Sequence, residues 1–351
     1  MSDDDPFGED LERDDDLDDG DGNASDDQYA DHSNMAEPVL NELGWELVEE
    51  SLVASVDLNV RPMRTEVGAT LIDFGCETPG SLGAGLALAE ISSAGLIDLD
   101  LETRSVDGAS WPHLRAVTDA PLEACLLSQF AGWKISQDSF YAIASGPMRA
   151  ARGSEAIYQK MAYFESAVRA CGVLEADDLP TDRILADMAD ECGVEVRGMA
   201  VCVAPVTSIA GSLQVVARSV ETAMHKLHEL GFDVTRVISA SGSAPLPPVM
   251  IDPILGIGTT NDAILYGGSV TMWIDGDDDH LAEVAPKIPS GASDMAGKPF
   301  AEIFKDAGED FYAIDPMLFS PAEIVLMNIE TGAVHRHGRR DESVLAKSFG
   351  I

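Results

Sequence analysis

The 351-residue chain contains few basic side chains. Lys and Arg together number 22, whereas Asp and Glu number 62, and the formal net charge at pH 7 is −40. Proteins that bind the phosphate backbone of nucleic acids present a basic surface, because much of their affinity comes from charge neutralisation. The shortage of Lys and Arg therefore argues against a nucleic-acid partner.

Cysteines and long apolar runs are also scarce. The five cysteines are odd in number and no two have C-x-x-C spacing, which argues against a disulfide framework or a zinc ribbon. This cysteine usage is typical of a reducing compartment. No apolar run approaches the roughly 20 residues of a membrane span, and the acidic N-terminus is unlike a signal peptide. We therefore expect a soluble, cytoplasmic protein with no membrane partner.

Acidic residues, by contrast, occur throughout the chain. Residues 1–37 contain 16 of them and one Arg, and residues 38–351 contain 46 together with 21 basic residues. The first residues have few apolar side chains, so we predict that 1–36 is a disordered acidic tail. An acidic excess in the folded part is typical of proteins adapted to very high salt, where charge repulsion is strongly screened. Most single Asp and Glu residues are then expected to serve solvation.

The apolar pattern mixes helical and strand periods in both halves of the chain. It predicts helices over 37–56, 86–91, 121–131, 155–170 and 299–307, and strands over 67–74, 140–144, 201–204, 234–238, 270–274 and 324–328. Residues 241–248 are too rich in proline for regular structure.

This order of elements predicts an α+β (mixed α/β) fold. After the tail, we divide the chain into an N-terminal α+β domain over 37–190 and a C-terminal α+β domain over 191–351. The terminal segments can cross from one domain to the other. A cleft between two such domains is where small-molecule sites tend to lie.

One stretch, 201–231, combines a buried strand, a turn of small residues and a helix. Ser212 is a candidate N-cap, because its hydroxyl can accept an orphan backbone N–H of the first turn. Gly231 fits just after the last turn, where the backbone takes a left-handed conformation that glycine adopts without steric cost. We therefore predict a single helix between these two residues.

One face of this predicted helix carries polar side chains at helical spacing. They are Gln214, Arg218, Glu221 and His225. Taken alone, Arg218 and Glu221 indicate a surface ion pair that stabilises the helix by only a few tenths of a kcal/mol. Beside a turn that leaves room for a ligand, the carboxylate can instead act as a general base toward water, with the arginine keeping it ionised.

Other motifs fit established sites poorly. The spacing of Gly80, Gly83 and Gly85 departs from the dinucleotide-binding fingerprint, so close helix packing is the better interpretation. Neither the pair His335 and His337 nor the acidic run 275–279 has the ligand spacing of a zinc or EF-hand site. We expect no metal.

The Ser145-Gly-Pro-Met-Arg149 loop lacks the G-x-S-x-G elbow of serine hydrolases, so we do not expect Ser145 to be a nucleophile. The backbone N–H groups of this loop, with Arg149 beside them, are better suited to bind an anion or the edge of a ring.

Four motifs in order resemble one enzyme family. Residues 204–222 (Ala-Pro-Val-Thr-Ser-Ile-Ala-Gly-Ser-Leu-Gln-Val-Val-Ala-Arg-Ser-Val-Glu-Thr) closely resemble the central motif of methenyltetrahydromethanopterin cyclohydrolases. Residues 131–133, 145–150 and 260–268 resemble three further signatures of that family. The similarity extends over about residues 40–350, which leaves only the acidic tail outside it.

The resemblance implies a reaction and an assembly. The family hydrolyses the methenyl bridge of 5,10-methenyl-tetrahydromethanopterin, or of a related tetrahydropterin, to the 5-formyl form in one-carbon metabolism. It uses no metal or organic cofactor, and its members are two-domain homotrimers. By the same resemblance Glu221 is the base that activates water, and Arg218 is its partner, which lowers the pKa of the carboxyl.

The motifs also imply substrate-binding residues, with Lys134 as a candidate second cation at the site. They are Ser145, Gly146, Pro147, Arg149, Pro205, Ser208, Ser212, Gln214, Asn261, Asp262, Tyr266 and Lys134. Three alternatives remain open at this point: tetrahydrofolate as the true carrier, a non-catalytic pterin- or nucleotide-binding protein, and an acidic structural oligomer without a ligand.

Overall fold

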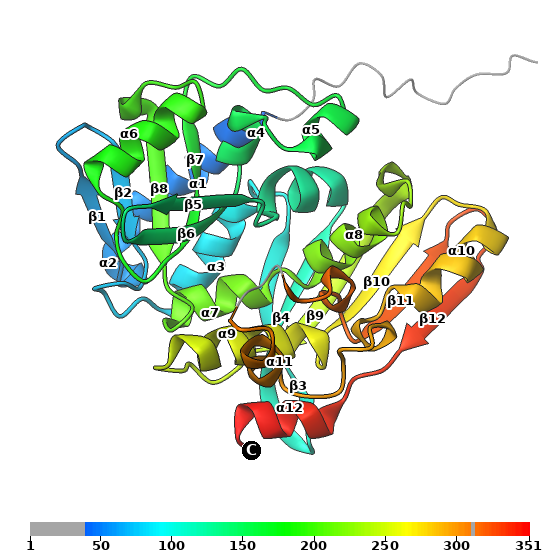
Figure 1. Ribbon diagram of the computed structural model, residues 1–351. Helices are drawn as coiled ribbons and strands as arrows, with labels where there is room; N and C mark the ends of the chain where they lie inside the picture. The colour runs from blue at the N-terminus through cyan, green and yellow to red at the C-terminus, as the bar shows by residue number, and fades with distance from the viewer. Residues whose placement is uncertain (1–38, 310–312) are drawn as a thin grey trace, which may run out of the picture. The chain divides into compact units, whose positions relative to one another are not determined.

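The computed structural model describes residues 39–309 and 313–351. The predicted acidic tail, residues 1–36, lies outside the described residues. Pro38–Ile351 forms one compact unit, and within it helices surround two six-stranded sheets (Figure 1). The mixed α/β class predicted from the sequence is confirmed.

The strands are distributed over the whole unit. They are β1 (Arg61–Arg64), β2 (Thr70–Asp73), β3 (Asp98–Val106), β4 (Ala109–Thr118), β5 (Trp133–Gln137), β6 (Phe140–Ser145), β7 (Ala170–Glu175), β8 (Met199–Ala204), β9 (Val237–Pro245), β10 (Ser269–Ile274), β11 (Glu323–Asn328) and β12 (Val334–Gly338).

The helices are short to medium in length. They are α1 (Leu40–Val53), α2 (Ser55–Leu58), α3 (Leu82–Ser92), the π-helix η2 (Leu122–Gln129), α4 (Met148–Arg152), α5 (Ala156–Lys160), α6 (Asp182–Glu191), α7 (Ile209–Val216), α8 (Ser219–Glu229), α9 (Pro253–Leu265), α10 (Asp278–Val284), α11 (Phe300–Asp306), α12 (Glu342–Phe349) and the 3₁₀ turns η3 (Val196–Gly198), η4 (Val234–Arg236), η5 (Ala285–Lys287), η6 (Ser290–Ala292) and η8 (Pro316–Leu318). Within the described residues, none of these helices has the length and apolarity needed to cross a bilayer.

The first sheet has the strand order β1-β2-β8-β7-β6-β5, and its three central strands β2, β8 and β7 are parallel. Parallel strands buried on both faces are continuously apolar, and every residue of β8 is buried. Alternate side chains of β8 point to opposite faces. Cys202 packs under α1 and α3, whereas Val201 and Val203 pack under α6.

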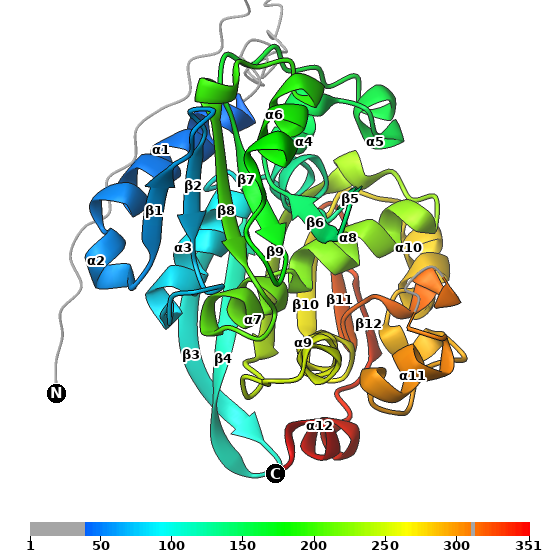
Figure 2. The ribbon, with the colours of Figure 1, turned by 60° about the vertical axis from the view of Figure 1, so that its left-hand side comes forward.

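The second sheet has the strand order β12-β11-β10-β9-β4-β3. Helix α8 places its apolar side chains Val220, Met224 and Leu227 against Val270 and Met272 of β10 in one buried cluster. Since these residues recur at helical spacing, the opposite face of α8 is left for polar groups. Figure 2 shows α8 running beside the strands of this sheet.

Strands that follow one another in the sequence are divided between the two sheets. Strand β8 lies between β2 and β7 in the first sheet, and the hairpin β3–β4 extends the second sheet beyond β9. The division of the chain into 37–190 and 191–351 therefore does not coincide with the division between the sheets, and the predicted domain boundary stays a prediction.

Three predictions of local structure outside residues 201–231 are wrong. The strand expected over 234–238 begins only at Val237, because Val234–Arg236 forms the 3₁₀ turn η4. Residues 241–248 were expected to be irregular, but β9 extends through Pro245. Proline is accepted there because it is the last residue of the strand, where one missing N–H costs little. The helix expected over 155–170 is only α5, since Ala162 adopts a left-handed conformation (φ 52°) and Ala170 already begins β7.

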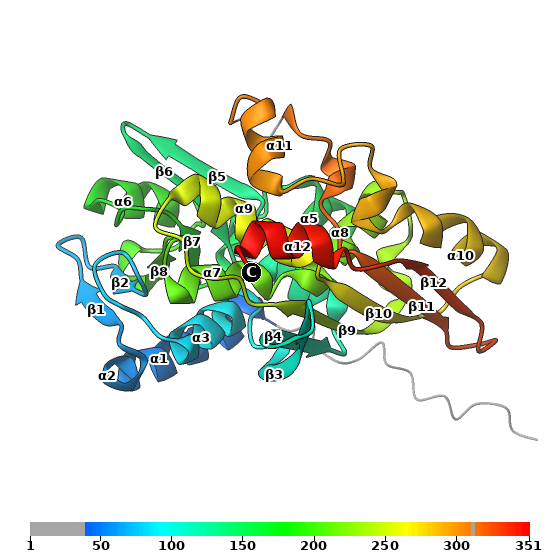
Figure 3. The same ribbon diagram turned by 90° about the horizontal axis from the view of Figure 1, so that it is seen from below.

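The C-terminal helix α12 lies against α9, as the view from below shows (Figure 3). Its Leu345 and Phe349 join a buried cluster with Leu213 of α7, and the Phe349 ring stacks on Trp111 of β4 at a centroid distance of 5.8 Å. Strand β4 and helix α12 thus share one buried cluster with residues of α7 and α9.

A tight turn joins β8 to α7. The Ser208 hydroxyl donates to the carbonyl oxygen of Pro205 at 2.8 Å and accepts the backbone N–H of Gly211 at 3.0 Å. A Cβ at residue 211 would lie 2.0 Å from the Pro205 carbonyl oxygen. Glycine is therefore required at this position for the turn to close.

We expect Gly211→Ala to lower the free energy of unfolding by about 1–3 kcal/mol, because the added methyl group must displace backbone atoms. Alanine is intrinsically the better helix former by about 1 kcal/mol, so a net loss isolates the steric effect. The control is Gly291→Ala, whose Cβ would meet no atom within 4 Å. Urea unfolding measures both variants, and a Gly211→Ala protein as stable as the parent would contradict the packing described.

Candidate active site

The helix predicted as one element is two. Helix α7 ends at Val216 and α8 begins at Ser219, with Arg218 between them. The predicted N-cap Ser212 is wrong: Ser208 caps the helix, since its hydroxyl already satisfies the N–H of Gly211. Gly231 follows the end of α8 with φ 78°, as predicted. Arg218 is thus the N-cap residue of α8, although its guanidinium still reaches Gln214, four residues earlier in α7.

A cavity of about 340 Å³ opens beside this break. Its walls come from the end of η2, from β6 and β7, from α7, α8 and α9, and from η8. The residues that line this active-site cavity are Phe130, Ala131, Tyr141, Ile143, Glu175, Val215, Arg218, Glu221, Thr222, His225, Ile257, Thr260, Asn261, Pro316 and Phe319. The structure thus brings Arg218, Glu221 and His225 to one mostly apolar space.

Arg218 is fixed by three neutral acceptors. Its Nη1 donates to the carbonyl oxygen of Gln129 at 2.6 Å, and its Nη2 donates to Ser145 Oγ and Gln214 Oε1, both at 3.0 Å. The side chain is 7% exposed. Burial lowers the pKa of Arg218, and the negative charges of Glu221 and Glu175 act in the opposite direction. Ser145 and Gln214 therefore hold the guanidinium and lie behind it.

Glu221 is buried in the wall of the same cavity, with 4% of its surface exposed. Burial raises the pKa of Glu221 to about 7, although the charges of Arg218 and Arg149 lower it. No ion pair within 4.0 Å joins Arg218 to Glu221 among the pairs found in residues 39–309 and 313–351. The arginine acts on the carboxyl through space, and desolvation is the larger effect.

Arg149 supports the cavity wall from outside. Its fully buried guanidinium pairs with Glu155, with Nε 2.9 Å from Oε1, and donates to the carbonyl oxygen of Ser128 at 2.9 Å. The Phe130 ring lies between Arg149 (5.1 Å to the centroid) and His225 (4.7 Å between centroids). Arg149 therefore fixes Phe130 and influences Glu221 by charge, without lining the cavity.

The remaining residues of the 145–149 loop also support the site. Gly146 has φ 95° and donates its N–H to the carbonyl oxygen of Ser128 at 2.9 Å. The Pro147 carbonyl oxygen accepts Asn41 Nδ2 at 2.8 Å. Neither residue lines the active-site cavity.

The other predicted binding residues are divided between the turn and helix α9. Pro205, Ser208 and Ser212 belong to the turn that starts α7, and they do not line the active-site cavity. Asn261 lines it, with its Nδ2 donating to the carbonyl oxygen of Ile257 at 2.8 Å. Asp262 points into the protein, where its Oδ1 accepts the backbone N–H of Phe300 at 2.8 Å.

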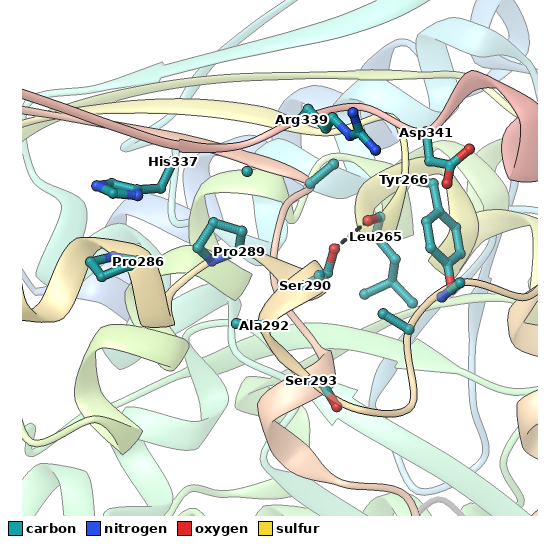
Figure 4. A pocket seen from close by; sticks show the side chains of 15 residues that line it. Leu265, Tyr266, Pro286, Pro289, Ser290, Ala292, Ser293, His337, Arg339 and Asp341 are labelled. Atoms are coloured by element: carbon teal, nitrogen blue, oxygen red, sulfur yellow. Dashed lines mark hydrogen bonds between the residues drawn. The ribbon is translucent and has the colours of Figure 1, made fainter.

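Tyr266 lines a different cavity, of about 590 Å³, shown in Figure 4. Its hydroxyl donates to the carbonyl oxygen of Lys298 at 2.6 Å, and Arg339 and Asp341 lie nearby in the same view. This cavity is larger than the active-site cavity, but neither Arg218 nor Glu221 reaches it. Because both residues of the family's central motif proposed for the chemistry line the smaller cavity, we base the function on that one.

Lys134 lies on β5 with an exposed side chain, and its Nζ is 5.4 Å from the centroid of the Tyr141 ring. Tyr141 lines the active-site cavity and Lys134 does not. The lysine therefore lies next to the ring of a cavity-lining residue.

Sequence reasoning missed two residues that the fold brings to the site. Glu175, the last residue of β7, lines the cavity near Arg218. Lys226 of α8 is 2% exposed, and its Nζ donates to the carbonyl oxygen of Met317, which anchors η8 and hence Pro316 and Phe319. An acidic residue ending a buried apolar strand was the available signal for Glu175; no local pattern pointed to Lys226.

Metal ligation was not expected from the sequence. Within the described part of the chain, no group of three or more His, Cys, Asp and Glu side chains is gathered as a metal site requires. His335 and His337 lie on the edge strand β12. The absence of a metal requirement stays a prediction.

Known proteins resemble this chain over almost its whole length. Residues 39–349 match the model of the family described as Cyclohydrolase (MCH). A methenyltetrahydromethanopterin cyclohydrolase from Rhodopirellula baltica is 46% identical over 320 residues, which cover 90% of this chain and 96% of that protein. Proteins with the same name from Methylobacillus flagellatus and Methanocella arvoryzae are each 40% identical over 314 residues, covering 89% of this chain and 96% and 98% of theirs. The chain therefore belongs to the methenyltetrahydromethanopterin cyclohydrolase family, as its four ordered motifs indicate.

Proposed function

We propose that this chain hydrolyses the methenyl bridge of 5,10-methenyl-tetrahydromethanopterin to the 5-formyl form. The observation that carries the proposal is Glu221, a buried carboxyl with a pKa of about 7, in a cavity that also holds Arg218. A general base is most effective when its pKa lies near the working pH. The names of the relatives support the reaction and the carrier.

The chemistry needs little more than a positioned water and a proton carrier. The methenyl carbon lies between two nitrogens in an amidinium-like cation and is already electrophilic. As the water oxygen bonds to this carbon, Glu221 takes one of its protons. Glu221 then delivers that proton to N10, the carbon–N10 bond breaks, and the former water oxygen becomes the formyl oxygen as its second proton leaves to solvent. Atoms and charge balance without a metal or an organic cofactor.

Arg218 sets the protonation state of the base. Without a nearby positive charge, a carboxyl as buried as Glu221 would stay protonated well above neutral pH. Arg218 lowers the pKa of Glu221, and three neutral acceptors hold its guanidinium in place without neutralising it. Its charge therefore remains available to the carboxylate.

The carrier, the assembly and the setting are further parts of the proposal. The relatives' names favour tetrahydromethanopterin over tetrahydrofolate. The acidic excess, with a net charge of −40, favours a cytoplasm of high salt, because screening then removes most of the self-repulsion. By family resemblance the chain forms a homotrimer. A side-by-side assay of the two methenyl carriers in molar salt tests the choice of carrier.

We expect Glu221→Gln to lower kcat by about 10²- to 10⁴-fold, the range that a general base contributes. The loss of the carrier's near-ultraviolet absorbance follows the reaction. Asp262→Asn is the matched control, because Asp262 is also a buried carboxyl with a pKa of about 7 but does not line the cavity. Near-normal turnover by Glu221→Gln would overturn the mechanism, and would favour a role in binding alone.

The pH profile should report the same base. The rate constant kcat is expected to rise with pH through about 7, since only ionised Glu221 can accept a proton. In Arg218→Gln the midpoint should move to higher pH, because the charge that lowers the pKa of Glu221 is gone. An unchanged midpoint in Arg218→Gln would exclude this role for the arginine.

Burying the base should also cost stability. The pKa of Glu221 rises from 4.5 to about 7 on folding. Between these pH values Glu221 is ionised in the unfolded chain but still protonated in the folded protein. The free energy of unfolding of the parent therefore falls as pH rises, and the loss is complete above pH 7. The free energy of unfolding of Glu221→Gln should therefore exceed that of the parent by up to about 3 kcal/mol at pH 8, and by much less at pH 5. Equal differences at the two pH values in urea unfolding would contradict this linkage.

A further inference from the structure

Glu175 occupies the junction of two adjoining cavities. It lines the active-site cavity and also a neighbouring cavity of about 310 Å³, to which Asp177 and Asp178 contribute; we call this second space the acidic cavity. Tyr141, Ile143 and Ile257 line both spaces as well. Because four residues are shared, the two cavities adjoin, and Glu175 lies where they meet.

The fold places this carboxylate at the edge where ligands of parallel sheets are found. Glu175 ends β7 and is paired in register with Ala204, which ends the parallel strand β8. Ligands of α/β sheets bind outside the carboxyl ends of the strands. The same edge carries the turn that leads into α7 and on to Arg218. Glu175 is thus held on a rigid strand, at a defined position relative to the proposed base.

The protein leaves the acceptor capacity of Glu175 largely unused. The one side-chain donor of the protein found beside its carboxylate among the described residues is Gln214, whose hydrogen bond lowers the pKa of Glu175, although Gln214 Nε2 has no partner within 3.5 Å. Burial raises the pKa of Glu175, while the charge of Arg218 lowers it. A partly buried carboxylate with a single weak donor of the protein beside it retains acceptor capacity that a ligand can satisfy.

A pterin supplies such donors in a matching geometry. One edge of its pyrimidine ring presents a ring N–H beside an exocyclic amino group, two parallel donors in one plane. A carboxylate accepts two such bonds at once, and bidentate contacts of this kind fix orientation as well as affinity. The flanking Tyr141, Ile143 and Ile257 are apolar or aromatic and suited to contact the faces of a ring.

The charges of the two cavities favour one orientation of the bound ligand. Asp177 and Asp178 add negative charge to the acidic cavity beyond Glu175. An anionic group of a substrate would be repelled there, whereas a donor-rich heterocycle would be attracted. The active-site cavity on the other side of Glu175 contains Arg218 and the proposed base.

We propose that Glu175 binds the donor edge of the substrate's pterin ring and so places the methenyl carbon beside Glu221. This assignment rests on the proposed function. It makes Glu175 a residue that determines recognition of the pterin head, separate from the proton transfer performed by Glu221.

The test is Glu175→Gln, which keeps the shape but presents an amide donor to one of the two pterin donors. We expect KM for the methenyl carrier to rise about 10- to 100-fold, the loss of hydrogen bonds to a charged group, with kcat within about threefold of the parent. Asp107→Asn, at an exposed turn between β3 and β4 that lines neither cavity, removes the same charge as a control, and its KM should change by less than about threefold. Thermal unfolding confirms that both variants are folded.

A carrier analogue without the exocyclic amino group identifies the contact. It should inhibit the parent and Glu175→Gln about equally. The analogue keeps only the ring N–H, which the carboxylate of Glu and the amide oxygen of Gln can both accept, and it lacks the amino group that would face the amide NH₂ of Gln. An unchanged KM in Glu175→Gln overturns the proposal. A fall in kcat at constant KM also overturns it, since it would place Glu175 in the chemistry. A parent protein that turns over no methenyl carrier would instead refute the proposed function, and Glu221→Gln separates the two failures.

Discussion

The burial of Arg218 and Glu221 around one cavity is the constraint on which the site depends. Charges removed from water are costly unless fixed partners replace the solvent. For Arg218 those partners come from three elements, two of them distant in sequence: the carbonyl of Gln129 in η2, the hydroxyl of Ser145 in β6 and the amide of the nearby Gln214 in α7. Glu221 has no comparable set among residues 39–309 and 313–351, and its pKa rises to about 7. The asymmetry keeps the arginine fixed and leaves the carboxyl able to exchange a proton.

The scaffold explains how these groups meet. Helix α8 is anchored on the second sheet by an apolar stripe that includes Val220 and Leu227, which turns Glu221 toward the cavity. The first sheet supplies Ser145 and Glu175 at strand ends. Buried Lys226 ties η8 to α8 and closes the cavity wall. The site is thus assembled at the meeting of both sheets, and each of its walls is held by a separate core or hydrogen bond.

Much of the fold was predictable because apolar periodicity is a local signal. It located α1, β8, β10 and β11 to within a few residues. It could not show the break at Arg218, since the helical spacing of Leu213, Val216 and Val220 continues across it. Nor could it show that β9 keeps Pro245, because this residue is paired with His113 of the distant strand β4.

The sequence by itself determined the acidic character of the chain, the mixed α/β class, the family motifs and the choice of Arg218 and Glu221 as candidate catalytic residues. Only the tertiary structure decided which residues share the cavity. It added Glu175 and Lys226, and it placed Arg149, Asp262 and Tyr266 elsewhere. The physical reason is that spacing along a helix fixes direction relative to its own axis. Burial, and with it the pKa of a carboxyl such as Glu221, is set by segments that approach from elsewhere in the chain.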